Sequence, residues 1–513
     1  MPVTKQYLRY EESSAFGVVC SRKAGALLFD GHLLDKNRKG RRLALAPALD
    51  HVIIWDLKTS EKVEVLKGDS HEVTSLCLSP SSPLVAIGYD DGNIKIFNME
   101  TARDTSVTFS GHSSSVISLS FDGSGTRLVS GGKDTDVIIW DVINECGLYR
   151  LKGHKGPVTW SSFMKDNNVL ITSSKDTMVK FWDLDTQHCF ETLTESTSEV
   201  WGCVLLPSQS KLVTLSSDSE LRVYELSPAP SHPLNVSLVG SIKRQLSTRP
   251  LGIRIDGRGS LMVVMSGDHL IEVYGIRNEE EIDKRRRKRI KKSKKKAAEA
   301  GLEWVESDTP TYVVEDQFHL LYNFNSSHRM KSCDIVQVSD NNYQLLLSLH
   351  ENMLQIHSLS LSPSPSSCLH HSLTAPGHRS DIRSLCLSSD GSLLSSGSND
   401  VIKIWRLRDQ SMATCIHTLT DCGYVVSLCV VPGDRHLLAG TKSGDVHLYE
   451  ISSGILLETF KAHSGSVWSV GVSPGRRGFT TCSADHDVKF WEFELITDED
   501  RPGSNNKLCN TKT

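Results

Sequence analysis

The sequence predicts an all-β fold, a WD-repeat β-propeller, and three observations support this prediction. A Trp-Asp pair occurs at Trp140-Asp141 and again at Trp182-Asp183, 42 residues later, and a Lys-Asp-Thr triplet precedes each pair. A Gly153-His154 pair lies between the two tryptophans. This period, with Gly-His near the start and Trp-Asp at the end, is typical of a propeller blade of four strands.

Ten positions along the chain have the pattern expected at the end of a blade. Each follows an alternating or fully apolar run, as expected of a buried strand. The intervals between them are 42, 43, 42, 42, 50, 82, 49, 44 and 42 residues. The positions are Trp55, Phe97, Trp140, Trp182, Tyr224, Tyr274, Ile356, Trp405, Tyr449 and Trp491. The sixth and seventh units are divergent and are assigned by position more than by motif.

About seven blades close a ring, which sets the domain boundaries that we expect. Residues 1–358 should form one complete seven-bladed propeller, with Gln6 to Cys20 as an outer strand that latches the ring. The Ser- and Pro-rich segment 359–371 looks like a linker. Residues 372–496 should form three blades of an incomplete second propeller, and 497–513 a disordered tail. Because three blades leave an open edge, we expect a shortened product of a longer protein rather than blades completed by another chain.

The spacing within the units predicts a repeated hydrogen-bond set. His112 precedes Asp134 by 22 residues, and the same interval separates two further His and Asp pairs. A constant interval is what a fixed imidazole–carboxylate hydrogen bond requires, and Ser130 and Thr172 or Ser173 would extend it to the indole N–H. The predicted sets are His112, Asp134 and Trp140; His154, Asp176 and Trp182; and His463, Asp485 and Trp491. A Ser/His/Asp hydrolase would need one privileged set in a cleft, so we interpret these recurring sets as structural.

The 82-residue interval between Tyr274 and Ile356 contains an insert, 276–312, with a concentrated positive charge. Eleven of the thirteen residues from Lys284 to Lys296 are basic, and removing them from the net charge of −4 leaves about −15 on the remainder. Acidic residues precede the run and Gly301 follows it, which predicts a surface helix. The ordinary interpretation is a solvated face, but this density favours RNA contact or nuclear import. The basic residues are Lys284, Arg285, Arg286, Arg287, Lys288, Arg289, Lys291, Lys292, Lys294, Lys295 and Lys296.

Other sequence features argue against several functional classes. The thirteen cysteines are scattered without a Cys-x-x-Cys pair, which favours reduced thiols over a zinc site or disulfides. No signal core or apolar run of about 18 residues occurs, so we expect a soluble, non-secreted protein without membrane association. His370-His371 is interpreted as part of a solvated loop. We therefore expect no catalytic residue, metal, cofactor or small-molecule substrate.

Several longer strings go beyond the general repeat pattern. The segments 4–10, 133–155, 175–190, 217–226, 432–463 and 487–495 closely resemble the WD repeat-containing protein 3 family, and the likeness extends in order over all ten units. That resemblance implies two tandem propellers and a helical C-terminal domain, from which this sequence departs by ending after three blades of the second ring. It also implies a subunit of the small-subunit processome, which assembles on pre-ribosomal RNA with the U-three small nucleolar RNA. The family carries a similar Lys-rich segment at the place of the insert.

The resemblance leads us to expect a non-catalytic scaffold of ribosome biogenesis and pre-rRNA processing in the nucleus and nucleolus. Its partners would be other processome WD-repeat proteins, the U-three small nucleolar RNA or pre-ribosomal RNA, directly or indirectly, and an import receptor. One rival hypothesis is a substrate receptor or adaptor of a ubiquitin ligase or signalling complex, which would not need the basic insert. Another is a propeller enzyme, which would need acidic or metal-binding residues converging on the central channel.

Overall fold

The computed structural model describes residues 17–495 and 508–510, except 22, 35–39, 69–70, 101–105, 165–167, 229–232, 246–247, 300–312, 340, 362–365, 375–376, 410–411 and 474. This part of the chain forms ten antiparallel sheets of four strands. The chain divides into two compact units, Val19–Thr374 and a second made of Met1–Val18 with Ala375–Thr513.

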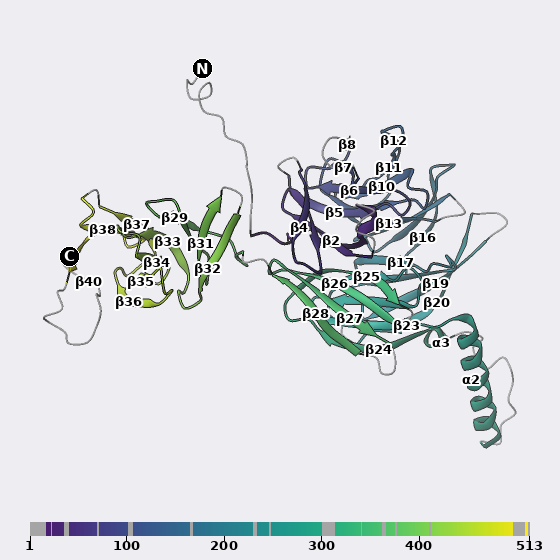
Figure 1. Cartoon of the computed structure of the whole chain (residues 1–513). Coiled ribbons are helices and arrows are strands. Elements are labelled where there is room, and N and C mark those ends of the chain that lie inside the picture. Colours follow the sequence, from purple (N-terminus) through teal and green to yellow (C-terminus); the bar gives the residue numbers. More distant parts are fainter. Residues whose placement is uncertain are drawn as a thin grey trace. The chain divides into compact units, whose positions relative to one another are not determined.

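The larger unit contains seven sheets, each built from four consecutive strands (Figure 1). The first sheet comprises β1 (Leu27–Asp30), β2 (Arg42–Ala48), β3 (His51–Asp56) and β4 (Lys62–Leu66), with a short 3-10 helix, Gly31–Leu33, after β1. The second comprises β5 (Val73–Leu78), β6 (Leu84–Tyr89), β7 (Asn93–Asn98) and β8 (Ser106–Ser110). The third comprises β9 (Val116–Phe121), β10 (Arg127–Gly132), β11 (Val137–Asp141) and β12 (Cys146–Leu151). The fourth comprises β13 (Val158–Phe163), β14 (Val169–Ser174), β15 (Val179–Asp183) and β16 (His188–Leu193).

Three further sheets complete the ring. The fifth comprises β17 (Val200–Leu205), β18 (Lys211–Ser216), β19 (Glu220–Ser227) and β20 (Asn235–Lys243). The sixth comprises β21 (Pro250–Ile255), β22 (Leu261–Ser266), β23 (Leu270–Ile276) and β24 (Phe318–Asn325). The seventh comprises β25 (Met330–Ser339), β26 (Asn342–Leu349), β27 (Met353–Ser360) and β28 (Ser366–Thr374).

The composition of the strands explains which of them are buried. The third strand of the third sheet, β11, reads VIIWD and is buried except at its last residue, whereas β12 reads CGLYRL and is largely exposed. The buried strands are rich in apolar β-branched residues because both faces of each sheet pack against neighbouring sheets. At the aromatic position of the third strand the pairing with the fourth strand shifts register, as between Ile139 and Trp140. The same irregularity occurs at Trp55, Trp182 and Trp405, which makes it a repeated bulge of the blade.

The ring closes between the first and seventh sheets. Leu28 N donates to Asp334 Oδ2 at 2.7 Å, and Ala26 N donates to Ser332 Oγ at 3.2 Å. Val19 N donates to Asn352 Oδ1 at 2.6 Å. The latch that we expected from Gln6 to Cys20 needs correction, because β28 is the outer strand of the seventh sheet. Residues 6–16 of that segment lie outside the described residues.

The boundary of the larger unit also differs from the expected linker at 359–371. Strand β27 extends to Ser360, and β28 pairs with it from Ser366 onward. The Ser/Pro composition is that of a linker, but pairing with β27 satisfies the backbone of this segment. The linker prediction was therefore wrong over most of its length, and His371 lies in β28 with Nε2 2.7 Å from Ser60 Oγ.

The insert lies between the third and fourth strands of the sixth sheet. It forms α2 (Glu279–Glu299), and the short α3 (Val314–Gln317) leads directly into β24. Strands β23 and β24 remain paired from Leu270↔Asn325 to Ile276↔Phe318. The sheet therefore stays intact around the insert, and α2 extends away from it (Figure 1).

The smaller unit contains the remaining three sheets. The eighth comprises β29 (Ser384–Leu387), β30 (Leu393–Gly397), β31 (Ile402–Asp409) and β32 (Met412–Leu419). The ninth comprises β33 (Val425–Val430), β34 (His436–Thr441), β35 (Asp445–Glu450) and β36 (Leu456–Lys461). The tenth comprises β37 (Val467–Val472), β38 (Gly478–Ser483), β39 (Val488–Leu495) and β40 (Leu508–Asn510).

These three sheets form part of a second propeller and leave apolar side chains exposed at both ends of the series. Leu385 on β29 is 61% exposed, and Phe490 on β39 is 68% exposed. In a closed ring such faces are covered by the neighbouring blades. No helix among the described residues is both long enough and apolar enough to cross a bilayer.

Candidate functional site

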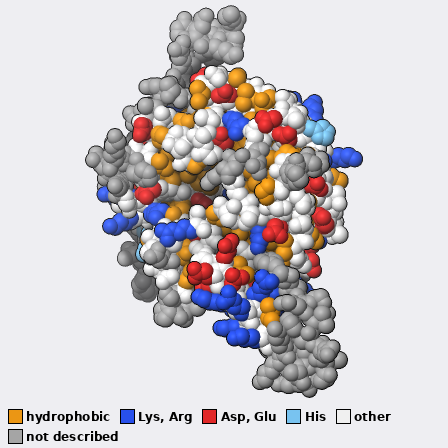
Figure 2. Space-filling model, turned by 90° about the vertical axis from the view of Figure 1, so that its right-hand side faces the viewer, with side chains coloured by type: hydrophobic (Ala, Val, Ile, Leu, Met, Phe, Trp, Pro, Cys, Tyr) orange, Lys and Arg blue, Asp and Glu red, His pale blue; other side chains and the backbone are white. Residues whose placement is uncertain are grey.

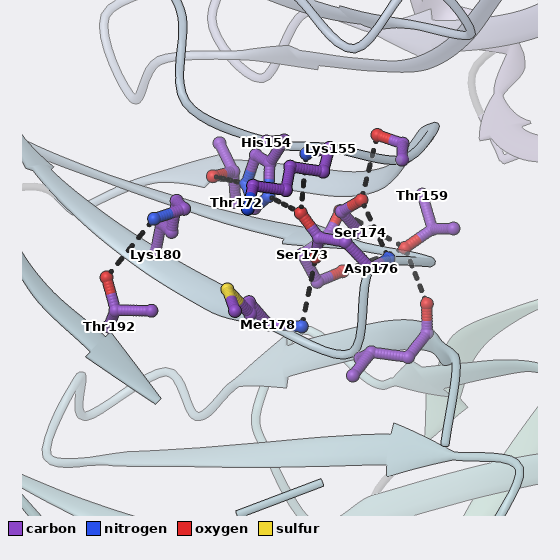
Figure 3. Close-up of polar contacts among 12 residues, drawn as sticks. His154, Lys155, Thr159, Thr172, Ser173, Ser174, Asp176, Met178, Lys180 and Thr192 are labelled. Atoms are coloured by element: carbon purple, nitrogen blue, oxygen red, sulfur yellow. Dashed lines mark hydrogen bonds and ion pairs between the residues drawn. The ribbon is translucent and has the colours of Figure 1, made fainter. Parts of the chain in front are cut away.

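The fourth sheet contains a chain of hydrogen bonds that links four side chains, and Figure 3 shows three of them, His154, Thr172 and Asp176. His154 lies in the loop before β13, with Nδ1 2.9 Å from Asp176 Oδ2 and Nε2 2.8 Å from Thr172 Oγ1. Trp182 Nε1 donates to the same threonine oxygen at 2.8 Å. A carboxylate only accepts, so Nδ1 carries a proton, and the Thr172 hydroxyl can donate to Nε2. A neutral imidazole therefore satisfies every member of this set.

The same geometry occurs in the third and tenth sheets. His112 lies 3.0 Å from Asp134 and 2.8 Å from Ser130, which also accepts from Trp140 at 2.8 Å. In the tenth sheet His463 Nδ1 lies 2.9 Å from Asp485, and Thr481 lies 2.8 Å from His463 and 2.9 Å from Trp491. The eighth sheet keeps the hydroxyl link, with His378 and Trp405 both contacting Ser396.

The burial of these sets argues for a role in packing rather than in hydrolysis. The side chain of His154 is 0% exposed and Thr172 is 0% exposed. A catalytic hydroxyl must reach a substrate, whereas this one is enclosed and accepts an indole N–H. We therefore propose that the three predicted sets stabilise the packing of their blades.

The aspartates of these sets are held in their charged form. Burial alone raises the pKa of Asp176, but hydrogen bonds from His154 and from Lys155 N outweigh it and lower the pKa to about 2. Lys155 N donates to Asp176 Oδ2 at 2.9 Å and Met178 N to Oδ1 at 3.0 Å. The carboxylate therefore joins the loop before the sheet to the turn between its second and third strands.

The fifth sheet replaces the imidazole with a guanidinium, which the sequence analysis missed. Arg222 Nη2 donates to Asp218 Oδ2 at 2.9 Å, and Nη1 donates to Ser216 Oγ at 3.1 Å. Asp218 precedes Tyr224 by six residues, the same offset as between Asp176 and Trp182. This six-residue offset could have identified Asp218 from the sequence as the aspartate of the set in the fifth sheet.

The sixth sheet uses a buried ion pair at the corresponding place. Arg244 and Glu272 are both 0% exposed, with Arg244 Nε 4.0 Å from Glu272 Oε2. Glu272 also accepts from Tyr274 Oη at 3.0 Å and from Gln245 N at 3.0 Å. Like Arg222 in the fifth sheet, Glu272 precedes a tyrosine by two residues. No local sequence motif predicts the participation of Arg244, which precedes Glu272 by 28 residues.

The basic run lies on α2, at the edge of the larger unit. The acidic first turn, Glu279 to Glu281, faces the positive end of the helix dipole, which favours this helix start. Five basic side chains of the described part are exposed: Lys284, Arg285, Arg287, Lys288 and Lys291. Figure 2 shows Lys and Arg side chains gathered over this part of α2, next to a group of acidic side chains. The side chains of Lys292, Lys294, Lys295 and Lys296 lie outside the described residues.

The opposite side of α2 is fixed to the sixth sheet through α3. Arg289 forms an ion pair with Asp316, and Arg277 Nη1 donates to Asp316 O at 3.0 Å. Arg277 N also donates to Gln317 O at 2.9 Å, and Lys211 Nζ to Gln317 Oε1 at 2.7 Å. Two of the basic residues, Arg286 and Arg289, are half-buried on this side. The exposed cations therefore project from a helix whose base is held by the ring.

Among the described residues no group of three or more His, Cys, Asp or Glu side chains is arranged to hold a metal ion. None of the twelve cysteines with described side chains forms a disulfide.

Comparison with known proteins agrees with the geometry of the ring. Residues 42–226 match the family model described as the WDR3 first beta-propeller domain, and residues 366–406 and 454–492 match the WD domain, G-beta repeat. The human WD repeat-containing protein 3 is 40% identical over 100% of this chain. The chain is therefore similar along its whole length to the WD repeat-containing protein 3 family.

Relatives of this chain also occur in mouse and in yeast. The mouse member is 39% identical over 100% of this chain, and U3 small nucleolar RNA-associated protein 12 of Saccharomyces cerevisiae is 31% identical over 99%. The chain spans 58% of the length of the human relative and 55% of the yeast relative.

Proposed function

We propose that this protein is a non-catalytic WD-repeat scaffold of the small-subunit processome, acting in pre-rRNA processing and small ribosomal subunit biogenesis. The observation that carries the proposal is α2, which presents five exposed cations on a body that is otherwise strongly acidic. The name of the yeast relative, U3 small nucleolar RNA-associated protein 12, also supports a role with small nucleolar RNA.

The charge of α2 suits contact with an RNA backbone. Lysine and arginine side chains neutralise phosphates and release counterions, so that affinity is large, salt-dependent and nearly independent of base sequence. The ion pair between Arg289, in the middle of α2, and Asp316 holds one side of the helix and leaves the exposed cations available. The proposed RNA partners are the U-three small nucleolar RNA and pre-ribosomal RNA.

The faces of the complete ring and of the partial second propeller would contact other processome WD-repeat proteins, and the basic run would also be recognised by an import receptor. The proposed location is the nucleus and nucleolus. We assign no catalytic residue, because the repeated His/Asp sets recur with the period of the fold and are enclosed.

Neutralising the exposed cations of α2 tests the RNA contact. In the full chain Lys284, Arg285, Arg287, Lys288 and Lys291 would be replaced by Gln, and binding of single-stranded RNA would be measured as a function of salt. At about 0.7 per phosphate, loss of five contacts should reduce the slope of log affinity against log salt by about 3.5. A variant in which the three lysines become Arg keeps the charge and should bind like the wild type. An unchanged slope in the Gln variant would refute the RNA contact.

A tagged pull-down from nuclear extract tests the scaffold role. Recovery of pre-ribosomal RNA and processome subunits is the expected result, and the Gln variant should lose the RNA. Recovery of a ubiquitin-ligase adaptor without RNA would replace our proposal by the rival hypothesis.

A further inference from the structure

Two cations contact the ring of Trp201 at one end of the larger ring. Trp201 lies at the start of β17, with Lys175 Nζ 4.3 Å and Arg249 Cζ 3.9 Å from its ring centre. Lys175 follows β14 of the fourth sheet and Arg249 precedes β21 of the sixth, so the indole of the fifth sheet contacts cations from both neighbouring blades. Lys331, the second residue of β25 in the seventh sheet, is the third cation of the cluster because it interacts electrostatically with Arg249 and Lys175.

The positive charges of this cluster are close enough to affect one another. Burial, and then the charges of Arg249 and Lys175, lower the pKa of Lys331. Within the described residues none of the three forms an ion pair with a carboxylate, whereas Lys23 lies 2.8 Å from Glu72. Cation–π contacts with Trp201 offset part of the repulsion, but an anion would relieve it further.

The connectivity of the sheets separates this cluster from α2. In a ring of four-stranded antiparallel sheets, the loops before the first strand and the turns after the second strand lie on one face, and the other connections lie on the opposite face. Arg249 is in a loop before a first strand, and Lys175 is in a turn after a second strand. Helix α2 is inserted after a third strand, β23. The two positive regions therefore lie on opposite faces of the ring.

We propose that Lys175, Arg249 and Lys331 bind an acidic segment of a partner protein. Arg249 suits a carboxylate because its guanidinium can make two parallel hydrogen bonds to it, and the lysines provide additional charge. Cations from the sheets on either side already engage the Trp201 ring, so it is poorly placed to stack on a nucleic-acid base. The same face carries three carboxylates in turns, Asp176, Asp218 and Asp268. These carboxylates would repel the continuous negative charge of a nucleic-acid backbone more strongly than the spaced acidic side chains of a peptide.

Binding of a short, fluorescein-labelled Glu-rich peptide to the full chain tests this proposal. The triple variant Lys175→Ala, Arg249→Ala, Lys331→Ala should weaken binding by about tenfold or more, since it removes every charge of the cluster. Lys133→Ala is the matched control, because Lys133 occupies the corresponding turn of the third sheet and is exposed. It should change the affinity by less than about twofold. A Gln-rich peptide of equal length should not bind.

Two further measurements distinguish the possible failures. The variant Lys175→Arg, Arg249→Lys, Lys331→Arg keeps the charges and should retain binding, and thermal melting of all variants establishes that they fold. Single-stranded RNA should bind the triple Ala variant as well as the wild type, because α2 is unchanged. The proposal fails if the wild type does not bind the acidic peptide, or if the triple Ala variant binds it normally. Loss of RNA binding in that variant would make nucleic acid the ligand of this face.

Discussion

Arg244 and Glu272 form an ion pair with neither side chain accessible to solvent, and the neighbouring fifth sheet has the Arg222–Asp218 pair at the corresponding place. Arg244 Nη2 also donates to Ser266 Oγ at 2.9 Å, and Glu272 accepts from Tyr274 Oη. Each charge depends on the other, because both have lost their hydration.

Removing one partner of this pair should therefore cost more than removing both. We expect Arg244→Met alone or Glu272→Leu alone to lower the free energy of unfolding by about 3–5 kcal/mol, and the double substitution to cost much less. Urea unfolding of the four proteins gives the coupling energy directly. Additive effects of the two substitutions would show that the charges do not depend on each other.

The set in the third sheet should contribute measurably to stability. Asp134→Ala leaves His112 without its carboxylate, and Trp140→Ala opens a cavity where Trp140 packs on Phe109 at a centroid distance of 5.1 Å. We expect a loss of about 2–4 kcal/mol for each variant. Lys133→Ala, at an exposed neighbouring site, should change stability by less than about 0.5 kcal/mol. If both core variants stayed within that margin, the structural role of the sets would be refuted.

The lowered pKa of Asp176 predicts an acid-dependent part of the stability. The folded pKa is about 2, below the value of about 3.9 expected in the unfolded chain. The stabilisation is therefore complete above pH of about 4 and is lost as the pH falls toward 2. Denaturation of the wild type and Asp176→Asn across this range should give curves that converge at low pH. Parallel curves would mean that the carboxylate is not preferentially charged in the folded state.

A turn of the fourth sheet holds a threonine in a left-handed backbone conformation. Thr177 has φ of 74°, and the corresponding residue of the second sheet is Gly92, with φ of 93°. Because a β-branched residue is strained there, Thr177→Gly should raise the free energy of unfolding by about 0.5–1 kcal/mol. Thr108→Gly, on the exposed outer strand β8, should instead lower it by about the same amount. Equal losses in both variants would contradict the strain at Thr177.

The repeat made much of the fold predictable from sequence. The 42-residue period and the apolar runs before Trp140 and Trp182 predicted the sheets, since each blade reuses one geometry. The linker at 359–371 was mispredicted because Ser and Pro composition does not reveal that β27 offers an unpaired edge. The set at Arg244 and the cluster around Trp201 were missed for another reason: their members come from distant segments and become neighbours only when the ring closes.

The placement of α2 between two paired strands makes it a segment that can be gained or lost without changing the sheet. Closing a loop costs free energy only as the logarithm of its length, so the sixth sheet can accept or lose such a segment while β23 and β24 keep their register. Evolution can then alter the charge, length and sequence of the insert without rebuilding the blade. The ring acts as a constant scaffold, and its connections between third and fourth strands are positions where new binding segments can be inserted.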